Sequence, residues 1–280
     1  MRYGMQLPVQ SQSTYYAEPW EATAGRDELA AIARACDDAG FDYIAVCDHV
    51  AIPADRAEAM STVWYDTVAT LGWLAGVTAR TRLLSHVYVP AYRHPLQTAK
   101  AFATIDELSG GRAILGIGAG HVEAEFDLLG VPFHQRGKLT DEALDAIRDA
   151  FAAEFGATGF GQRPRPRQAG GPPIWVGGSS PAALRRAAER GDGWLPQGTT
   201  KAEMPDAVAR IHEIRAEASR GEQPFTVGAI LRPLYVGERI RSEVAEYEAM
   251  GVDQVQVRFR SRTCEEYLDQ IAAFAAEVME

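Results

Sequence analysis

Residues 29–49, LAAIARACDDAGFDYIAVCDH, join a predicted helix to a predicted strand. The apolar positions of the helix recur every three or four residues, at Leu29, Ile32, Ala33 and Cys36. Gly40 ends this helix, because glycine is common just after the last helical residue. Residues 41–46 are mostly apolar and rich in aromatic and branched side chains, which is typical of a buried strand. The segment therefore predicts one helix–strand unit whose strand leads into Asp48 and His49.

The same alternation continues along the whole chain. Strands are expected at residues 3–7, 41–46, 82–89, 113–117, 174–176, 193–195, 225–231 and 254–257. Each is followed by a segment with helical spacing, for example 181–189 and 203–219. Residues 156–173 are rich in Gly, Pro, Gln and Arg, so we expect a loop or an irregular insertion there.

Eight strand–helix units predict an α/β fold of the (β/α)8 type, the TIM barrel. Strands that alternate with helices form parallel sheets with right-handed crossovers. Eight such units in 280 residues fit a closed barrel better than an open, doubly wound sheet. A nucleotide-binding open sheet would also need GxGxxG after its first strand, and the chain has no such motif there. We therefore expect residues 1–280 to form a single barrel domain.

The composition is that of a folded protein, and it argues against several classes of function. Hydrophobic residues make up 46% of the chain and charged residues 24%. The net charge of -10 argues against binding to nucleic acid or to a membrane surface. No segment has the roughly 18 apolar residues of a membrane span. The three cysteines lack metal-ligand spacing, so we expect reduced thiols in a cytoplasmic protein.

In such barrels, functional residues gather where strands end and in the loops that follow. The candidates at these places are Asp48, His49, residues 85–90, Gly116, Gly118, Gly120, His121, Gly177, Gly178, Ser179, residues 194–197, Arg258 and Phe259. The glycines of residues 116–120 are expected to leave space for a flat ring over the mouth of the barrel. Aromatic residues could line the pocket of a planar ligand or, more commonly, fill the core. These aromatic residues are Tyr15, Tyr16, Trp20, Trp64 and Tyr65.

Residues 175–181, WVGGSSP, are typical of an anion site at the start of a helix. The two glycines let a ligand approach the backbone closely. Ser179 or Ser180 is expected to cap a helix that begins at Pro181. The free amide groups of such a helix start attract phosphate. The alternative is an ordinary capped turn without a ligand.

His49 is the strongest candidate for proton chemistry. It follows a hydrophobic strand, so its imidazole is expected to point into the mouth of the barrel, where it could donate or accept a proton. The alternative is a structural histidine that is bound to Asp48 or to a helix start. No HxH or HExxH spacing indicates a metal, and no GxSxG motif indicates a serine nucleophile.

Several stretches together resemble the luciferase-like monooxygenase superfamily, and most closely its branch that uses the deazaflavin coenzyme F420. They are GFDYIAVCDH at 40–49, YRHP at 92–95, LSGGR at 108–112, LGIGAGHVEAEF at 115–126, LGVPF at 129–133, RG at 136–137, PIWVGGS at 173–179 and AAERGDGW at 187–194. Their order and spacing extend over roughly the first 200 residues.

The resemblance implies a luciferase-like barrel with a cofactor at its mouth. A bulge in the third strand, with a cis peptide near Ser85, His86 and Val87, would support the cofactor ring. The residues expected to bind the cofactor are Asp48, Ser85, His86, Val87, Gly118, Gly120, Gly177, Gly178, Ser179 and Gln197, with the cofactor phosphate on residues 177–179. His49 matches the histidine beside the reactive ring carbon, and His121 is the second expected catalytic residue. Tyr15, Trp64 and Tyr65 are expected to line the substrate pocket.

The activity that the resemblance implies is hydride transfer between F420 and a small organic substrate. F420-dependent sugar-phosphate dehydrogenases have a glutamate where this chain has His121, which argues against that activity here. A first alternative is an FMN-dependent monooxygenase that works with a separate flavin reductase, and a second is a catalytically silent flavin-binding barrel. The resemblance also implies a homodimer.

Overall fold

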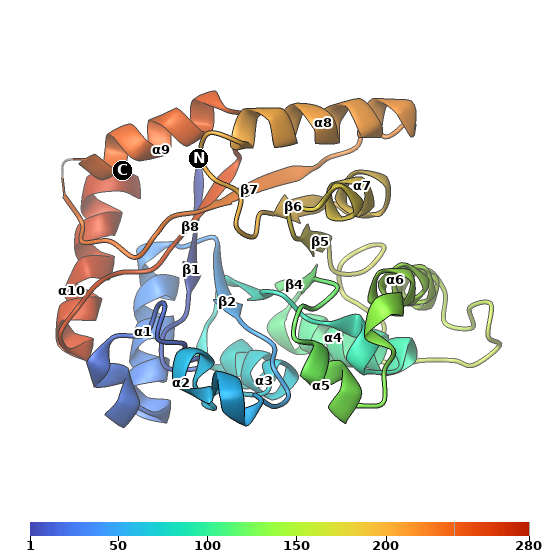
Figure 1. The fold of residues 1–280 in the computed structure, drawn as a ribbon, viewed down its shortest axis with the longest axis horizontal. Coiled ribbons are helices and arrows are strands. Elements are labelled where there is room, and N and C mark those ends of the chain that lie inside the picture. Colours follow the sequence, from blue (N-terminus) through green and yellow to red (C-terminus); the bar gives the residue numbers. More distant parts are fainter. Residues whose placement is uncertain (238, 280) are drawn as a thin grey trace.

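A computed structural model describes residues 1–237 and 239–279. Parallel strands close a barrel in which the strand order follows the chain, from β1 to β8 and back to β1 (Figure 1). The strands are β1 (Arg2–Gln6), β2 (Tyr43–Val46), β3 (Arg82–Ser85), β4 (Ala113–Ile117), β5 (Ile174–Gly177), β6 (Gly193–Leu195), β7 (Thr226–Ile230) and β8 (Gln254–Val257). The predicted (β/α)8 barrel is therefore confirmed.

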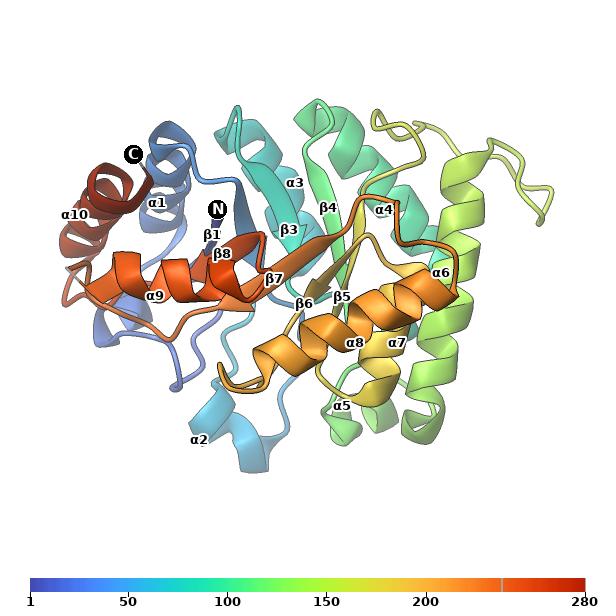
Figure 2. The ribbon, with the colours of Figure 1, turned by 90° about the horizontal axis from the view of Figure 1, so that it is seen from above.

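Helices follow every strand and cover the outside of the barrel. They are α1 (Arg26–Ala39), α2 (Ala57–Met60), α3 (Thr67–Val77), α4 (Pro95–Ser109), α5 (Glu123–Leu128), α6 (Arg136–Ala152), α7 (Pro181–Arg190), α8 (Met204–Glu217), α9 (Arg239–Ala249) and α10 (Cys264–Phe274). The short α2 and α5 follow β2 and β4, and Figure 2 shows both on one side of the strands. That side holds the carboxyl ends of the strands.

Two groups of apolar side chains hold the barrel together. The larger group fills the layer between strands and helices. The smaller one fills the barrel interior and consists of Tyr43, Ala45, Leu84, Ile114, Trp175 and Leu195. The ring of Tyr43 takes the space of a side chain at Gly4, where a Cβ would lie 2.0 Å from the ring. The interior is thus packed beneath the carboxyl ends of the strands, and a ligand must bind above it.

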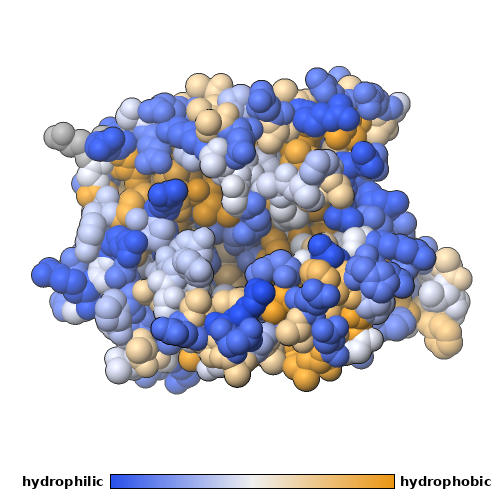
Figure 3. Space-filling model, viewed as in Figure 1, coloured by the Kyte–Doolittle hydropathy of each residue, from blue (hydrophilic) through white to orange (hydrophobic). Residues whose placement is uncertain are grey.

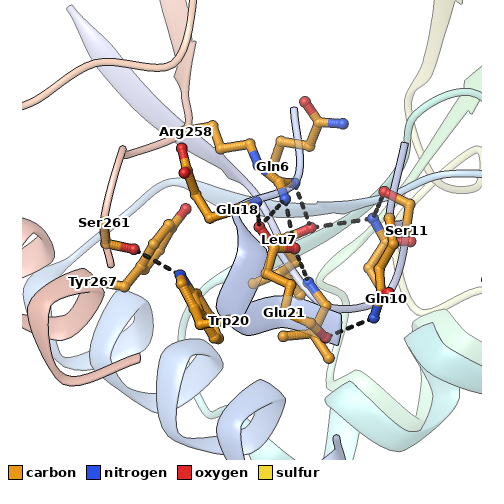
Figure 4. A network of polar contacts seen from close by, with 12 residues as sticks. Gln6, Leu7, Gln10, Ser11, Glu18, Trp20, Glu21, Arg258, Ser261 and Tyr267 are labelled. Carbon is orange, nitrogen blue, oxygen red and sulfur yellow. Dashed lines mark hydrogen bonds and ion pairs between the residues drawn. The ribbon is translucent and has the colours of Figure 1, made fainter. Parts of the chain in front are cut away.

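Buried polar contacts close the seam between the first and last strands (Figure 4). Arg258, just after β8, donates to both carboxylate oxygens of Glu21 at 2.6 and 2.7 Å. Glu21 also accepts from the Val9 amide at 2.8 Å, and both members of the pair are almost fully buried. Because Glu21 belongs to a short 3-10 helix (Pro19–Thr23), the pair fixes the whole loop after β1.

Two sequence predictions about elements were wrong in part. The third strand was expected to continue to residue 89, but β3 ends at Ser85 and a bulge follows. The peptide bond between His86 and Val87 in this bulge is cis, as the resemblance implies. The apolar spacing of residues 144, 147, 151 and 155 predicts one helix that reaches Phe155, yet α6 ends at Ala152, and Phe155 is exposed. The expected irregular segment is confirmed: the chain between α6 and β5 forms a loop that extends away from the barrel (Figures 1 and 2).

Candidate functional site

A cavity of about 890 Å³ opens at the carboxyl ends of the strands. Figure 3 shows this face of the molecule hollowed near its centre. Residues at the ends of β1 to β7, or in the loops that follow them, line the cavity. Its size is in the range of small-molecule and cofactor sites.

The cavity brings together most of the residues predicted from the sequence. These are His49, His121, Asp48, His86, Val87, Gly118, Gly120, Gly177, Gly178, Ser179, Gln197, Tyr15 and Trp64. Two predicted residues do not line the cavity. Ser85 is fully buried beneath the cavity, where its hydroxyl donates to the Gly116 carbonyl at 2.8 Å. Tyr65 points away from the cavity into a separate hollow beside Trp73 of α3.

The glycines at the cavity floor make room for Val87. A Cβ at Gly118 would lie 2.5 Å from one methyl group of Val87, and a Cβ at Gly177 would lie 2.7 Å from the other. In the structure, Val87 takes the space beside Gly118 and Gly177. They let the bulge rise into the cavity, so that Val87 forms its floor.

His49 is held by Glu125, the carboxylate at the start of α5. The His49 Nδ1 lies 2.7 Å from Glu125 Oε2, and both side chains are largely buried. The other oxygen of Glu125 accepts from the amides of Val50 and Ala51 at 2.7 and 3.2 Å. His49 is thus tied to the first turn of α5, which is one form of the structural alternative considered from the sequence, and not to Asp48.

The charge of Glu125 determines which nitrogen of His49 carries a proton. Burial alone would raise the pKa of the Glu125 carboxyl, but the hydrogen bonds that it accepts outweigh burial and hold this pKa below its usual value. The carboxylate is therefore ionised at neutral pH and can only accept, so His49 Nδ1 carries the proton. Nε2 is the nitrogen that remains free to meet a ligand.

Two aromatic side chains complete the surroundings of His49. The Trp64 ring meets the His49 ring edge-on with centroids 4.4 Å apart, and the His121 ring does so at 5.7 Å. Burial, helped by the nearby His49 and Arg56, lowers the pKa of His121 although Glu125 opposes the shift. His121 is therefore neutral at pH 7, whereas a glutamate at this position would bring a negative charge.

Asp48 supports the rim of the cavity through a charged pair. Its two oxygens accept from the Arg93 guanidinium at 2.8 and 2.9 Å. The Thr67 hydroxyl and the Val89 amide donate to the same carboxylate at 3.0 and 2.9 Å. Asp48 lines the cavity, but its oxygens are already used, so it fixes the bulge and the loop after it.

The opposite side of the cavity is formed by the start of α7. Ser180 is the capping residue, since its hydroxyl accepts from the Ala183 amide, and Pro181 is the first helical residue. This resolves the choice between Ser179 and Ser180. The Ser179 hydroxyl donates to the Gln197 carbonyl at 2.7 Å and so ties β5 to β6. Arg136 also lines the cavity. It lies near α7, since the carbonyl of the next residue, Gly137, accepts from Arg186 of α7.

Sequence reasoning missed Glu125, Arg56 and Arg136. Glu125 lies within the matched stretch 115–126, in the first turn of α5, whereas His121 precedes this helix. Its place in that stretch is the signal that could have identified it. Arg56 belongs to a loop without helical or strand spacing, and no local pattern distinguishes it.

Residues 1–237 and 239–279 contain no group of three or more His, Cys, Asp or Glu side chains that could hold a metal ion. In the same residues, no helix has the length and apolar character needed to cross a membrane.

Comparison with known proteins agrees with this geometry. A protein of Mycobacterium tuberculosis described as uncharacterised is 30% identical over 247 residues, which cover 82% of this chain and 84% of that protein. The 5,10-methylenetetrahydromethanopterin reductase of Methanopyrus kandleri is 30% identical over 224 residues, 72% of this chain and 60% of the reductase.

Solved structures share the fold at lower identity. The monooxygenase RslO1 of Streptomyces bottropensis superimposes with a TM-score of 0.80 at 19% identity, over 100% of this chain and 99% of that one. The coenzyme F420 dependent tetrahydromethanopterin reductase of Methanopyrus kandleri gives 0.75 at 20% identity, over 99% and 98%. A family model described as luciferase-like monooxygenase matches residues 1–276. The chain therefore belongs to the luciferase-like monooxygenase family.

Proposed function

We propose that the protein is an oxidoreductase that binds coenzyme F420 at the mouth of the barrel and transfers a hydride between it and a small organic substrate. The observation that carries this proposal is the pairing, in one cavity, of an anion site at the start of α7 with the His49–Glu125 pair on the other side. The 30% identity to a methylenetetrahydromethanopterin reductase supports a reductase. The F420-dependent enzymes among the structural neighbours support this cofactor.

The residues present fit a flat, phosphate-tailed molecule. The φ of Gly178 is +115°, and a Cβ there would lie 3.0 Å from the Ala183 side chain, so a larger residue at this position would strain the turn at the start of α7. The amides at this helix start and the Arg136 guanidinium would hold the phosphate. The apolar surface of Val87 would support the ring. A bound deazaflavin supplies the hydride chemistry.

The chain itself contributes orientation and proton handling. Glu125 holds His49 in one orientation and one tautomer, so that Nε2 of His49 can take or give a proton at the substrate. Trp64 packs against the same imidazole and limits the access of water to it. His121, neutral at pH 7, adds a hydrogen-bonding group without a negative charge.

Fluorescence titration of the purified protein with F420 and, separately, with FMN tests this proposal. We expect F420 to bind and the R136Q variant to bind it about tenfold more weakly, because one charged hydrogen bond to phosphate is lost. R34Q is the matched control, since Arg34 is an exposed residue of α1 that does not line the cavity. Binding of reduced FMN without binding of F420 would support the monooxygenase alternative that RslO1 represents, and would overturn the proposal.

A further inference from the structure

The cavity has a second side, away from α7, whose residues the cofactor tail would leave free. His49, Trp64, His121 and Tyr15 line it, and the short 3-10 helix Ala54–Arg56 borders it. The helix α2 follows directly and is attached to the loop after β1, because both the amide and the hydroxyl of Thr14 donate to the Ala59 carbonyl. Arg56 therefore belongs to a segment that is held in place beside the mouth.

Charged side chains of both signs line the cavity. Its charged residues are Asp48, Asp55, Arg56, Arg136 and Arg186. Asp48 is neutralised by Arg93, and Arg186 by Asp141 of α6. Within the described part of the chain, neither Arg56 nor Arg136 has a carboxylate within 4.0 Å. The Arg136 guanidinium donates to the Phe133 carbonyl at 3.1 Å and lies over the Phe133 ring. The ionised Glu125 carboxylate behind His49 adds to the negative charge of Asp55, so Arg56 is a local cation in a cavity without an overall positive excess.

The two arginines lie on different sides of the cavity. Arg136 lies by α7, where the phosphate of the cofactor is expected. Arg56 lies close enough to His121 for its charge to help lower the pKa of that imidazole. A substrate that reaches the His121 and His49 rings enters the field of Arg56, and the Glu125 carboxylate behind His49 acts on it with the opposite sign.

We propose that this second side binds a substrate that combines a flat apolar body with a carboxylate, and that Arg56 pairs with the carboxylate. The flat body would lie against Trp64 and Tyr15, which form the aromatic walls. The proposal rests on the proposed function only in placing the cofactor tail at α7. Asp55 lines the same cavity, and its negative charge weakens the binding of the carboxylate.

Benzoate and its uncharged analogue benzamide are suitable probes, followed through the imidazole proton signals of His121 by NMR. With F420 present, benzoate should bind about five- to tenfold more tightly than benzamide. The R56Q variant should lose this preference, whereas D55N should increase it about two- to threefold because a repelling charge is removed. R34Q should behave like the wild type.

The same titrations without F420 separate this proposal from the cofactor proposal. Benzoate binding that depends on Arg56 in protein unable to bind F420 would support the substrate site and overturn the cofactor. Equal affinity for benzoate and benzamide, or a preference that R56Q keeps, would overturn the substrate site. So would a preference that disappears only in R136Q, because the carboxylate would then bind beside α7.

Discussion

At the level of single residues, the fold keeps the buried His86 imidazole uncharged at neutral pH. Burial lowers its pKa to about 4, and the Gln256 and Gln197 amides meet its two ring nitrogens at 3.3 and 3.4 Å. In the unfolded chain the same imidazole takes up its proton near pH 6.5. The unfolded state therefore binds more protons than the folded state between these two pH values, and acidification favours unfolding.

We expect the free energy of unfolding to fall by about 3 kcal/mol on this account as the pH falls from about 6.5 to about 4. The H86N variant should lose this component and show a flatter pH profile, whatever its stability at pH 7. Urea unfolding at several pH values measures the profile, with H212N at an exposed position as the control. A profile for H86N as steep as that of the wild type would contradict the assignment.

At the level of elements, the bulge after β3 and the ends of β4 and β5 depend on one another. In the G118A variant, the new Cβ would lie 2.5 Å from Val87, so we expect a loss of about 1–3 kcal/mol of stability. The G118A/V87A double variant should recover about 1 kcal/mol relative to the sum of the single variants. Chemical denaturation measures both. G72A is the control, since a Cβ there has nothing within 4 Å, and additive effects would refute the coupling.

The elements that could not be bounded from the sequence depend on contacts between distant residues. The apolar spacing of α6 continues to Phe155, but the Arg165 guanidinium binds the carbonyls of Ala150 and Ala153 and so stabilises the end of the helix. No local sequence pattern predicts that Arg165 makes these contacts. Residues 86–89 have strand composition, yet the chain leaves β3 at His86 and pairs again only where Tyr88 meets Ile117.

At the level of the whole molecule, the Glu21–Arg258 pair joins the two ends of the barrel. In the R258A variant the buried Glu21 carboxylate loses its partner, so we expect a loss of about 3–5 kcal/mol of stability. R260A removes the more exposed pair with Glu18 nearby and should cost at most about 1 kcal/mol. Thermal unfolding of both variants measures the difference, and equal losses would show that the pair does not secure the seam.

The sequence predicted the barrel, the mouth and most of the residues around it, because strand ends in a closed barrel necessarily converge. It could not predict which side chains of the long loops turn inward. Trp64 and Tyr65 are adjacent and chemically similar, yet only Trp64 lines the cavity. Arg56 was missed for the same reason, whereas Glu125 and Arg136 lie in the first turns of α5 and α6, within stretches that the resemblance covers.

The Glu125 carboxylate has a consequence for how this barrel can diversify. It accepts from His49, Val50 and Ala51 after β2, and the Tyr92 hydroxyl after β3 lies 3.4 Å away. The loops after β2, β3 and β4 are thus joined through one carboxylate. A chimaera that takes only one of these loops from a related protein separates this buried anion from its donors. New specificities are more readily recruited from the loops after β6 and β7, which can be exchanged without breaking these contacts.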